Sequence, residues 1–516
     1  SLLIQVDPLT VFRRTNMAEG KTKVINVPPP VVRPGGAERS YLLVHEPGEP
    51  TVSVRAPTVQ ERASIQAIPP EVMSMIFAMS NKLTCAAACL VCRRWSGAAI
   101  DELWRSLPSL RPLFQLLGPL VRTDSGLSLH PECVLTERSW DLFRSYAARV
   151  QSLTHDEVVP SDGISAVLIT RTLAIHPGGI LPNLRAVDWH ICERGLSHPL
   201  AFCPPSLERM VLRLGDDDSL TESAIRLLYD LSSSLANRLK YFKFGTTSSY
   251  SQDADLATAL TAFLKTQSNL LELKLPEYAI QYPVVVATAC QASMHLRTFS
   301  AQVHDVTREM FRVILGASAE RGDSLRCIWL TRTGYDLYDE TICLADIQPM
   351  LQLTVIEEIR FWHEGKLELT APDIRQMGQA WQGLTSLMLH PDGEPGIPLS
   401  QLATFAQWFP ALQRFAARFD CAEYTLSAYE VPSRFKSLRR LTWFDAKIAD
   451  SQRFRVAEFL AAVLGPDVEL GIREFGLDSF DALEEALDWE IGSGSEKFRD
   501  LIDAFYQVHE AISKMK

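Results

Sequence analysis

Three cysteines near the N-terminal end of the chain have the spacing that first suggests chemistry. Cys85, Cys89 and Cys92 recur at i, i+4 and i+7, which places all three on one face of a helix. A structural zinc ion takes four ligands, usually with a turn between ligand pairs, and no histidine lies nearby in the sequence. We therefore interpret these cysteines as small apolar residues that pack along one helix face, and we expect no metal site.

The familiar catalytic motifs are missing from the sequence. It has no Gly-rich phosphate loop, no G-x-S-x-G nucleophile elbow and no H-E-x-x-H zinc motif. The 11 histidines are isolated from one another, and an isolated histidine is more often a surface or core residue than a general base. We therefore expect a non-catalytic protein that needs no cofactor.

Charge and hydropathy exclude several classes of partner. The net charge of −11 argues against general nucleic-acid binding, which favours a basic surface. No apolar run approaches the length of a membrane span, and residues 1–16 lack the basic start and continuous apolar core of a secretory signal. The cysteines are scattered without paired spacing. These features predict a protein of the reducing cytoplasm or nucleus.

The segment 68–107 is expected to form helices that are apolar on nearly every face. Pro69 and Pro70, followed by an acid, suit a helix start, because proline there loses no hydrogen bond and an acid favours the positive helix end. Apolar residues then dominate 72–79 and 83–92. Such helices must be covered by a core or by a second chain, and we favour a second chain. The alternative is a small helical hairpin buried at the edge of the main domain.

The order of residues in this segment resembles an F-box. Pro69-Pro70-Glu71 is followed by Ile76-Phe77, by Leu90-Val91-Cys92-Arg93-Arg94-Trp95 and by Leu103-Trp104. The family usually has Leu-Pro where this chain has Ile68-Pro69, a change that keeps the apolar contact. F-boxes dock on the Skp-type adaptor of cullin–RING ubiquitin ligases, so the resemblance implies an adaptor-binding site. Its residues would be Ile68, Pro69, Val72, Ile76, Phe77, Leu90, Val91 and Trp95.

From Val150 onward one pattern recurs: an apolar residue, two others, an apolar residue, one other and an apolar residue. We call the three apolar residues of each copy its anchors. Helical stretches lie between several copies, and the average spacing of about 29 residues is near the top of the range of leucine-rich repeats. The region resembles a leucine-rich-repeat solenoid, a horseshoe with a parallel sheet on its concave face and helices outside. The usual Asn or Cys after the last anchor is present only at Cys192, so we expect irregular loops. The copies begin at Leu184, Leu207, Leu239, Leu270, Leu296, Leu325, Ile356, Leu384, Leu412, Leu438 and Ile472.

Together these patterns predict an α/β chain that begins with a helical F-box and continues as a solenoid. Residues 108–149, with one helix over 110–120 and another within 130–149, would link the two and cap the first repeat. The parts are a disordered Pro/Gly-rich leader (1–60), the F-box (61–107), the helical linker (108–149), the solenoid (150–477) and an acidic C-terminal capping helix (478–516).

Strand alternation places the residues between the anchors on the concave face. Basic residues with interleaved tryptophans are unexpectedly frequent there, and arginine and tryptophan are enriched in binding hot spots. Guanidinium groups match pairs of anionic oxygens, so we expect an acidic or phosphorylated protein segment as ligand. Ordinary exposed polar residues, some of them misregistered, are the alternative. The candidate substrate-binding residues are Trp329, Arg360, Trp362, His390, Arg414, Arg418 and Arg440.

The two resemblances imply the substrate-recognition subunit of an SCF-type (Skp–cullin–F-box) ubiquitin ligase. The F-box would bind the adaptor and, through it, the cullin–RING core, while the repeats hold a protein substrate close to the E2. One alternative is a leucine-rich-repeat interaction scaffold that is not linked to ubiquitylation. Another is an F-box protein that works with the adaptor in assembly or transport. A cysteine that accepts ubiquitin would make the chain an enzyme, which we do not expect.

Overall fold

The computed structural model describes residues 68–123, 126–156, 163–175, 179–191, 199–215, 220–246, 254–275, 283–304, 306–320, 322–334, 337, 340–421, 433–444, 448, 450–465, 467–473 and 504–507. The predicted leader, residues 1–60, lies outside these ranges. So does the predicted acidic helix, residues 478–516, apart from residues 504–507. The chain divides into two compact units, Ser1–Arg105 and Ser106–Lys516.

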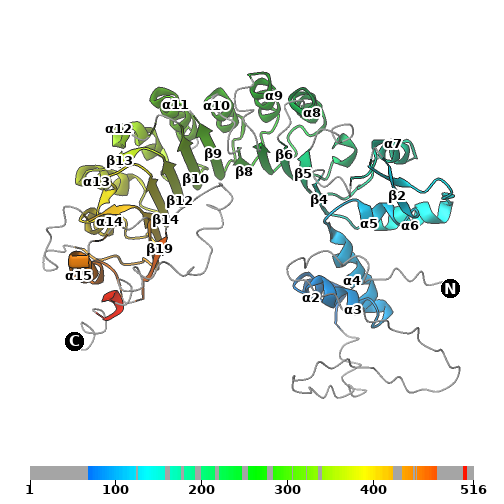
Figure 1. The fold of residues 1–516 in the computed structure, drawn as a ribbon, viewed down its shortest axis with the longest axis horizontal. Coiled ribbons are helices and arrows are strands. Elements are labelled where there is room, and N and C mark those ends of the chain that lie inside the picture. Colours follow the sequence, from blue (N-terminus) through cyan, green and yellow to red (C-terminus); the bar gives the residue numbers. More distant parts are fainter. Residues whose placement is uncertain are drawn as a thin grey trace, which may run out of the picture. The chain divides into compact units, whose positions relative to one another are not determined.

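The described part of the first unit consists of three helices, α2 (Pro70–Ala78), α3 (Lys82–Ala88) and α4 (Arg93–Arg105) (Figure 1). Pro70 begins α2, where its missing N–H costs no hydrogen bond. The Asn81 side chain caps α3 by accepting a hydrogen bond from the Thr84 backbone N–H at 2.8 Å. The helices pack around a small core formed by Met73, Phe77, Cys85, Ala88 and Ala99.

The described part of the second unit is built on one sheet of thirteen parallel strands, which follow one another in the sheet in chain order (Figure 1). This order is consistent with the predicted solenoid, because each strand pairs only with the strands of the neighbouring units. The strands are β1 (Ser106–Leu107), β4 (Ser152–Asp156), β5 (Ala186–Ile191), β6 (Arg209–Leu214), β7 (Tyr241–Thr246), β8 (Glu272–Lys274), β9 (Thr298–His304), β10 (Cys327–Thr333), β12 (Glu358–His363), β14 (Ser386–Pro391), β16 (Arg414–Ala417), β18 (Arg440–Phe444) and β19 (Glu469–Arg473).

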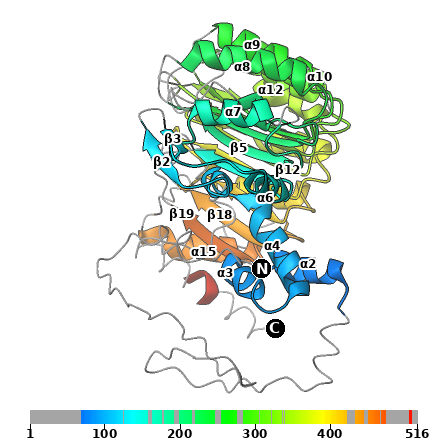
Figure 2. The ribbon, with the colours of Figure 1, turned by 90° about the vertical axis from the view of Figure 1, so that its right-hand side faces the viewer.

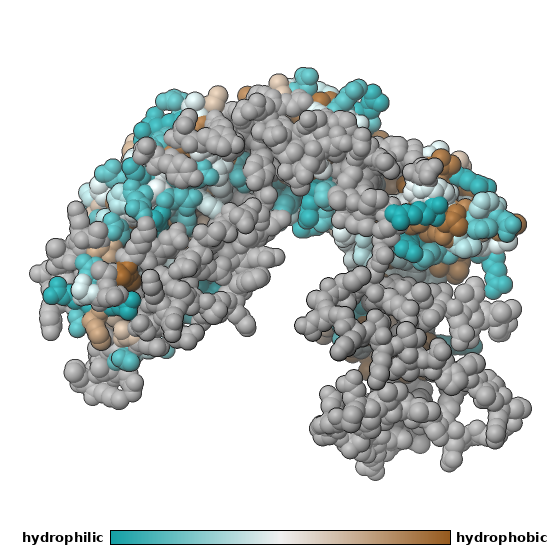
Figure 3. Space-filling view, in the orientation of Figure 1, coloured by the Kyte–Doolittle hydropathy of each residue, from teal (hydrophilic) through white to brown (hydrophobic). Residues whose placement is uncertain are grey.

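Helices lie in most of the connections between successive strands and cover one face of this sheet (Figure 2). Neighbouring helices pack on one another, α8 on α9, α9 on α10 and α10 on α11. Their outer side mixes hydrophilic with scattered apolar residues (Figure 3). We call the opposite face of the sheet the concave face. The helices are α7 (Ala166–Ile175), η1 (Pro199–Phe202), α8 (Leu220–Ser234), α9 (Ala254–Lys265), α10 (Pro283–Ala292), α11 (Arg308–Ala319), α12 (Leu344–Ile347), η3 (Gln348–Gln352), α13 (Ala371–Ala380), α14 (Gln401–Trp408), η5 (Asp450–Gln452) and α15 (Arg453–Val463).

One apolar residue from each strand forms a continuous row beneath the helices, each in register with the next. No member of this row is more than 4% exposed. Burying a side chain of this size contributes about 1.5–3 kcal/mol, and neighbouring units are needed to bury it. The middle anchors of ten predicted copies, Val187 to Leu441, fall in this row. Its members are Leu107, Leu153, Val187, Met210, Phe242, Leu273, Phe299, Ile328, Ile359, Leu387, Phe415, Leu441 and Leu470.

The eleventh predicted copy is out of register. In β19, Leu470 pairs with Leu441 and Ile472 pairs with Trp443, so Ile472 occupies the third anchor position instead of the first. The reason is a short connection: α15 ends at Val463 and the strand already begins at Glu469. The remaining anchors predicted for this copy, residues 475 and 477, lie outside the described residues.

The region 108–149 is less helical than predicted. Of the helix expected over 110–120 only α5 (Arg111–Phe114) forms, whereas the helix expected within 130–149 is present as α6 (Glu137–Ala147). Between them β2 (Leu120–Thr123) and β3 (Gly126–Leu129) make an antiparallel hairpin. Gly126 permits it, because its φ is 111° and a Cβ there would lie 2.7 Å from the Gly163 carbonyl oxygen. In addition Ser106–Leu107, predicted as the end of the F-box, joins the sheet as β1.

Two further parallel strand pairs lie in the connections between the main strands, where irregular loops were expected. β11 (Thr341–Cys343) pairs with β13 (Lys366–Glu368), and β15 (Ile397–Pro398) pairs with β17 (Phe419–Asp420). Each pair joins the chain that follows one main strand to the chain that follows the next. These connections are therefore ordered by backbone hydrogen bonds in place of a ladder of Asn or Cys side chains.

Buried ionisable groups lie on the helix-covered face between β10 and β12. Arg332 is 1% exposed and pairs in register with the fully buried His363. The Arg332 guanidinium donates to the Val306 carbonyl oxygen at 2.8 Å and lies 2.9 Å from the Glu340 carboxylate. Burial and the positive charge of Arg332 lower the pKa of His363 to about 4, so its imidazole is neutral at neutral pH.

Acid should therefore destabilise the second unit through His363. In the unfolded chain this histidine takes up a proton near its ordinary pKa of about 6.5, whereas in the folded chain it resists until about 4. The stability that the neutral ring contributes is fully present at a pH above the unfolded-state pKa of about 6.5, and it is lost as the pH falls towards the folded-state pKa of about 4. Between about pH 7.5 and pH 5 the loss is about 2 kcal/mol in the free energy of unfolding. Urea titrations of His363→Gln should show a pH dependence smaller by that amount. An unchanged pH dependence would contradict the assignment.

Deleting residues from 400 onward should destabilise earlier units as well. The deletion removes β16, so Leu387 of β14 loses its in-register neighbour Phe415 and the sheet gains an open apolar edge. We expect aggregation, or protease cleavage that spreads into the preceding units. Limited proteolysis and light scattering measure this. A truncated chain that stays monomeric, with its remaining strands as well protected as before, would show that the units are energetically independent.

Candidate functional site

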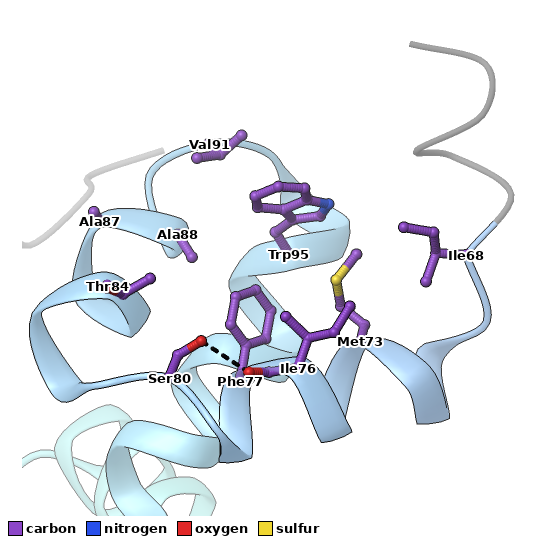
Figure 4. A pocket seen from close by; sticks show the side chains of 10 residues that line it. All are labelled: Ile68, Met73, Ile76, Phe77, Ser80, Thr84, Ala87, Ala88, Val91 and Trp95. Atoms are coloured by element: carbon purple, nitrogen blue, oxygen red, sulfur yellow. Dashed lines mark hydrogen bonds between the residues drawn. The ribbon is translucent and has the colours of Figure 1, made fainter. Parts of the chain in front are cut away.

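The three helices of the first unit enclose an open pocket of about 440 Å³ with an almost entirely apolar lining. Side chains from α2 and α3 face each other across it, and Trp95 closes one side (Figure 4). Its polar residues are Ser80 and Thr84, and the Ser80 hydroxyl donates to the Ile76 carbonyl oxygen at 2.8 Å. The lining residues are Ile68, Met73, Ile76, Phe77, Ser80, Thr84, Ala87, Ala88, Val91 and Trp95.

The pocket has a buried floor and an exposed apolar rim. Met73 and Phe77 are each 3% exposed, and the Phe77 ring packs edge-to-face on Trp95 with centroids 6.0 Å apart. On the rim, Ile76 is 41% exposed and Val91 is 62% exposed. A firmly packed floor beneath exposed apolar side chains can receive an apolar group from a partner with little loss of side-chain freedom.

The apolar surface continues outside the pocket along α2. Val72, Met75, Ile76 and Met79 recur at i, i+3, i+4 and i+7, so they share one face of the helix, and all four are exposed. Leu83 and Leu90 are exposed as well. Contiguous exposed apolar surface of this kind marks protein interaction sites, because water solvates it poorly.

All eight residues that the sequence predicted for adaptor binding lie in this unit. Ile68, Ile76, Phe77, Val91 and Trp95 line the pocket. The other three are exposed but are not among the lining residues: Val72, Pro69 and Leu90.

Sequence reasoning missed Met73 and the α3 side of the pocket. Thr84, Ala87 and Ala88 recur at i, i+3 and i+4, and Val91 continues the series at i+7. Their small side chains bring the α3 backbone close to the pocket. This spacing was visible in the sequence and is the signal that could have revealed them.

The three cysteines of this unit do not form a metal site. Cys85 is buried, Cys89 is half-buried and Cys92 is exposed. Burial raises the pKa of the Cys85 and Cys89 thiols, which keeps both protonated at neutral pH. Within the described parts of the chain, no group of His, Cys, Asp and Glu is suited to hold a metal ion. None of the helices in those parts has the length and apolar character that a membrane crossing requires.

The seven candidate concave residues lie on the concave side but in three different rows. Trp329 and Arg360 are in register in the middle row, and Trp362 and His390 are in register in the row at the C-terminal ends of the strands. Arg414 and Arg440 are in register in the row at the strand starts. Arg418 directly follows β16. They therefore share one face of the sheet but not one row of it.

Acidic residues on neighbouring strands and loops pair with these arginines. Glu358 accepts from Arg360 Nε at 2.5 Å, and its other oxygen lies 3.5 Å from Arg414 Nη2. Arg440 lies 2.8 Å from Glu469. In the same way Arg418 Nη2 lies 3.2 Å from a Glu394 carboxylate oxygen. These ion pairs largely neutralise the predicted run of basic residues.

An apolar cluster occupies the concave side of β14, β16 and β18. Met388, Ala416 and Phe444 are each at most 3% exposed, and Trp362 packs against them. His390 is 1% exposed, and its ring centroid lies 4.5 Å from that of Phe444. His390 therefore cannot contact a ligand in this conformation.

Asp392 fixes two side chains of this cluster. One of its carboxylate oxygens accepts from Trp362 Nε1 at 2.9 Å, and the other lies 3.1 Å from His390 Nδ1. Asp392 was not among the predicted site residues, because it follows β14 in a connection whose path no repeat pattern specifies.

Comparison with known proteins bears on the first unit. Residues 65–107 match the family model described as the F-box-like domain, which includes α2, α3, α4 and the whole pocket lining. Among curated proteins no match to the chain was found. The chain therefore carries an F-box-like domain at residues 65–107, followed by an α/β region with a large parallel sheet.

Proposed function

We propose that this chain is the substrate-recognition subunit of an SCF-type ubiquitin ligase. In this account the F-box-like domain binds a Skp-type adaptor, which links the chain to a cullin–RING core. The second unit is a leucine-rich-repeat horseshoe that holds a protein substrate. The chain contributes no catalytic residue; it raises the effective concentration of substrate lysines near the E2.

The observation that carries this proposal is the exposed apolar surface around the pocket of the first unit. F-box-like domains typically bind Skp-type adaptors, and here the domain exposes a packed apolar pocket, together with the apolar face of α2. Met75, Met79 and Leu90 of this domain are each more than 60% exposed.

Placing a carboxylate on the pocket rim should abolish adaptor binding without unfolding the chain. Ile76 and Val91 are both partly exposed and line the pocket, so Ile76→Asp or Val91→Asp buries a charge only when the adaptor is bound. Losing the burial of one such side chain alone costs about 1.5–3 kcal/mol, which is about ten- to a hundredfold in Kd. Binding of purified Skp-type adaptor, measured by calorimetry, gives the affinity. Pro69→Ser combined with Ile76→Asp should have at least the same effect.

Ala78→Asp is the matched control, because Ala78 belongs to the same helix, is exposed and does not line the pocket. This variant should bind adaptor as the unchanged chain does. Adaptor affinity that survives Ile76→Asp and Val91→Asp would contradict the proposed docking surface. Co-purification from cells then separates the accounts: adaptor with cullin supports a ligase subunit, adaptor alone an adaptor-dependent assembly factor, and neither an interaction scaffold.

A further inference from the structure

The middle of the concave face carries a stack of one aromatic and two cationic side chains. Lys274 of β8, Ser300 of β9, Trp329 of β10 and Arg360 of β12 follow one another in register across four neighbouring strands. The Arg360 guanidinium carbon lies 3.9 Å from the centroid of the Trp329 ring, and Lys274 Nζ lies 4.8 Å from it. Both distances are typical of cation–π contacts.

This stack covers the serine between its members. To reach Trp329, the Lys274 side chain crosses the strand that carries Ser300, and Ser300 is 0% exposed as a result. Lys274 and Arg360 are themselves only 5% and 8% exposed. Trp329 is half-buried, so it is the member of the row that solvent and a ligand reach first.

Three polar atoms in this row are buried and lack a hydrogen-bond partner. They are Ser300 Oγ, Trp329 Nε1 and Arg360 Nη1, and within the described structure nothing accepts from them. All three can donate a hydrogen bond, and the nitrogens of Trp329 and Arg360 cannot accept one. Buried donors without an acceptor are costly, so this concentration on adjacent strands indicates a place for an acceptor atom that the chain does not supply.

The charges around the row favour a negative charge on that acceptor. Lys274 lies 3.6 Å from Glu272, whereas Arg360 and Arg414 share Glu358. Lys243 of β7 adds a further cationic side chain in register with Lys274. An anionic group of a ligand would therefore lie among several cationic side chains, and hydrogen bonds to a charged acceptor are the stronger ones.

We propose that Ser300, Trp329 and Arg360 bind a carboxylate side chain of an acidic substrate segment, with Lys274 supplying the fourth donor. This inference rests on the proposed function, in which the concave face holds the substrate. Lys274 swings from the indole ring onto the carboxylate and thereby uncovers Ser300 Oγ. Trp362 is not part of this carboxylate site, because its Nε1 already donates to Asp392.

The test uses the full chain on arrays of immobilised peptides that vary at all positions except the central one. That position is Glu in one array, Gln in a second and phosphoserine in a third. We expect about tenfold stronger binding to the Glu array than to the Gln array, as hydrogen bonds to a charged group imply. Trp329→Phe keeps the ring and removes only the N–H, so it should weaken this preference. Ser300→Ala should do the same, and Arg360→Met combined with Lys274→Met should abolish it.

Arg209→Met is the matched control, since Arg209 also stacks on an aromatic ring of the concave face, that of Tyr241, but lies outside the row. It should keep the preference for Glu. Equal binding to the Glu and Gln arrays, loss of the preference in the control, or stronger binding to phosphoserine than to Glu would each overturn the carboxylate site. Adaptor binding of the same preparations is measured in parallel. Retained adaptor binding without a Glu preference rejects this inference alone, whereas lost adaptor binding rejects the proposed function.

Discussion

The second unit depends on one constraint: each strand buries its inward apolar residue only with the help of its neighbours. Phe299 is fully buried because Leu273 and Ile328 lie beside it in register, and the same holds along the whole row. A shift by one residue would turn every inward side chain of a strand to the other face. The row therefore fixes the register, and the register in turn fixes which side chains meet on the concave face. The approach of Lys274 and Arg360 to Trp329 follows from it.

The first unit, in contrast, leaves apolar residues exposed. Its three described helices are too few to bury all of their apolar residues, and a core of five side chains leaves one face of α2 and the pocket rim exposed. Covering such an apolar surface with a partner removes it from water, which lowers the free energy of the complex. The two units thus have different proposed roles: one offers an apolar surface to a partner, and the other offers a row of buried hydrogen-bond donors to a ligand.

Much of this organisation could be predicted from the sequence, because it depends on local periodicity. The spacing of anchors such as Ile328 and Leu387 predicted the strands and their register. The residues around Ile76-Phe77 predicted the helices of the first unit. The register predicted for the eleventh copy was wrong, because the connection after Val463 is short and β19 begins earlier in the sequence than expected. The hairpin of β2 and β3 within 108–149 was not predicted, because it depends on the backbone conformation of Gly126, which no periodic pattern indicates.

The concave site was predicted less well, since its contacts join residues far apart in the chain. Arg414 pairs with Glu358 two strands away, and Arg440 pairs with Glu469 on the next strand. Register places such partners together, but one strand read alone does not reveal them. The burial of His390 has the same origin, because it depends on Phe444 two strands further along the sheet. Ser300 escaped notice because its small side chain matters only through the lysine that crosses it.

The central claim is that the first unit docks on an adaptor while the second remains free for a substrate. Hydrogen exchange of the full chain, with and without a purified Skp-type adaptor, tests this most directly. The account predicts slower exchange in α2, in α3 and in the chain between Ala88 and Trp95 when adaptor is present, with unchanged exchange in β8, β9, β10 and β12. Unchanged exchange in α2 and α3, or protection confined to the concave strands, would contradict it.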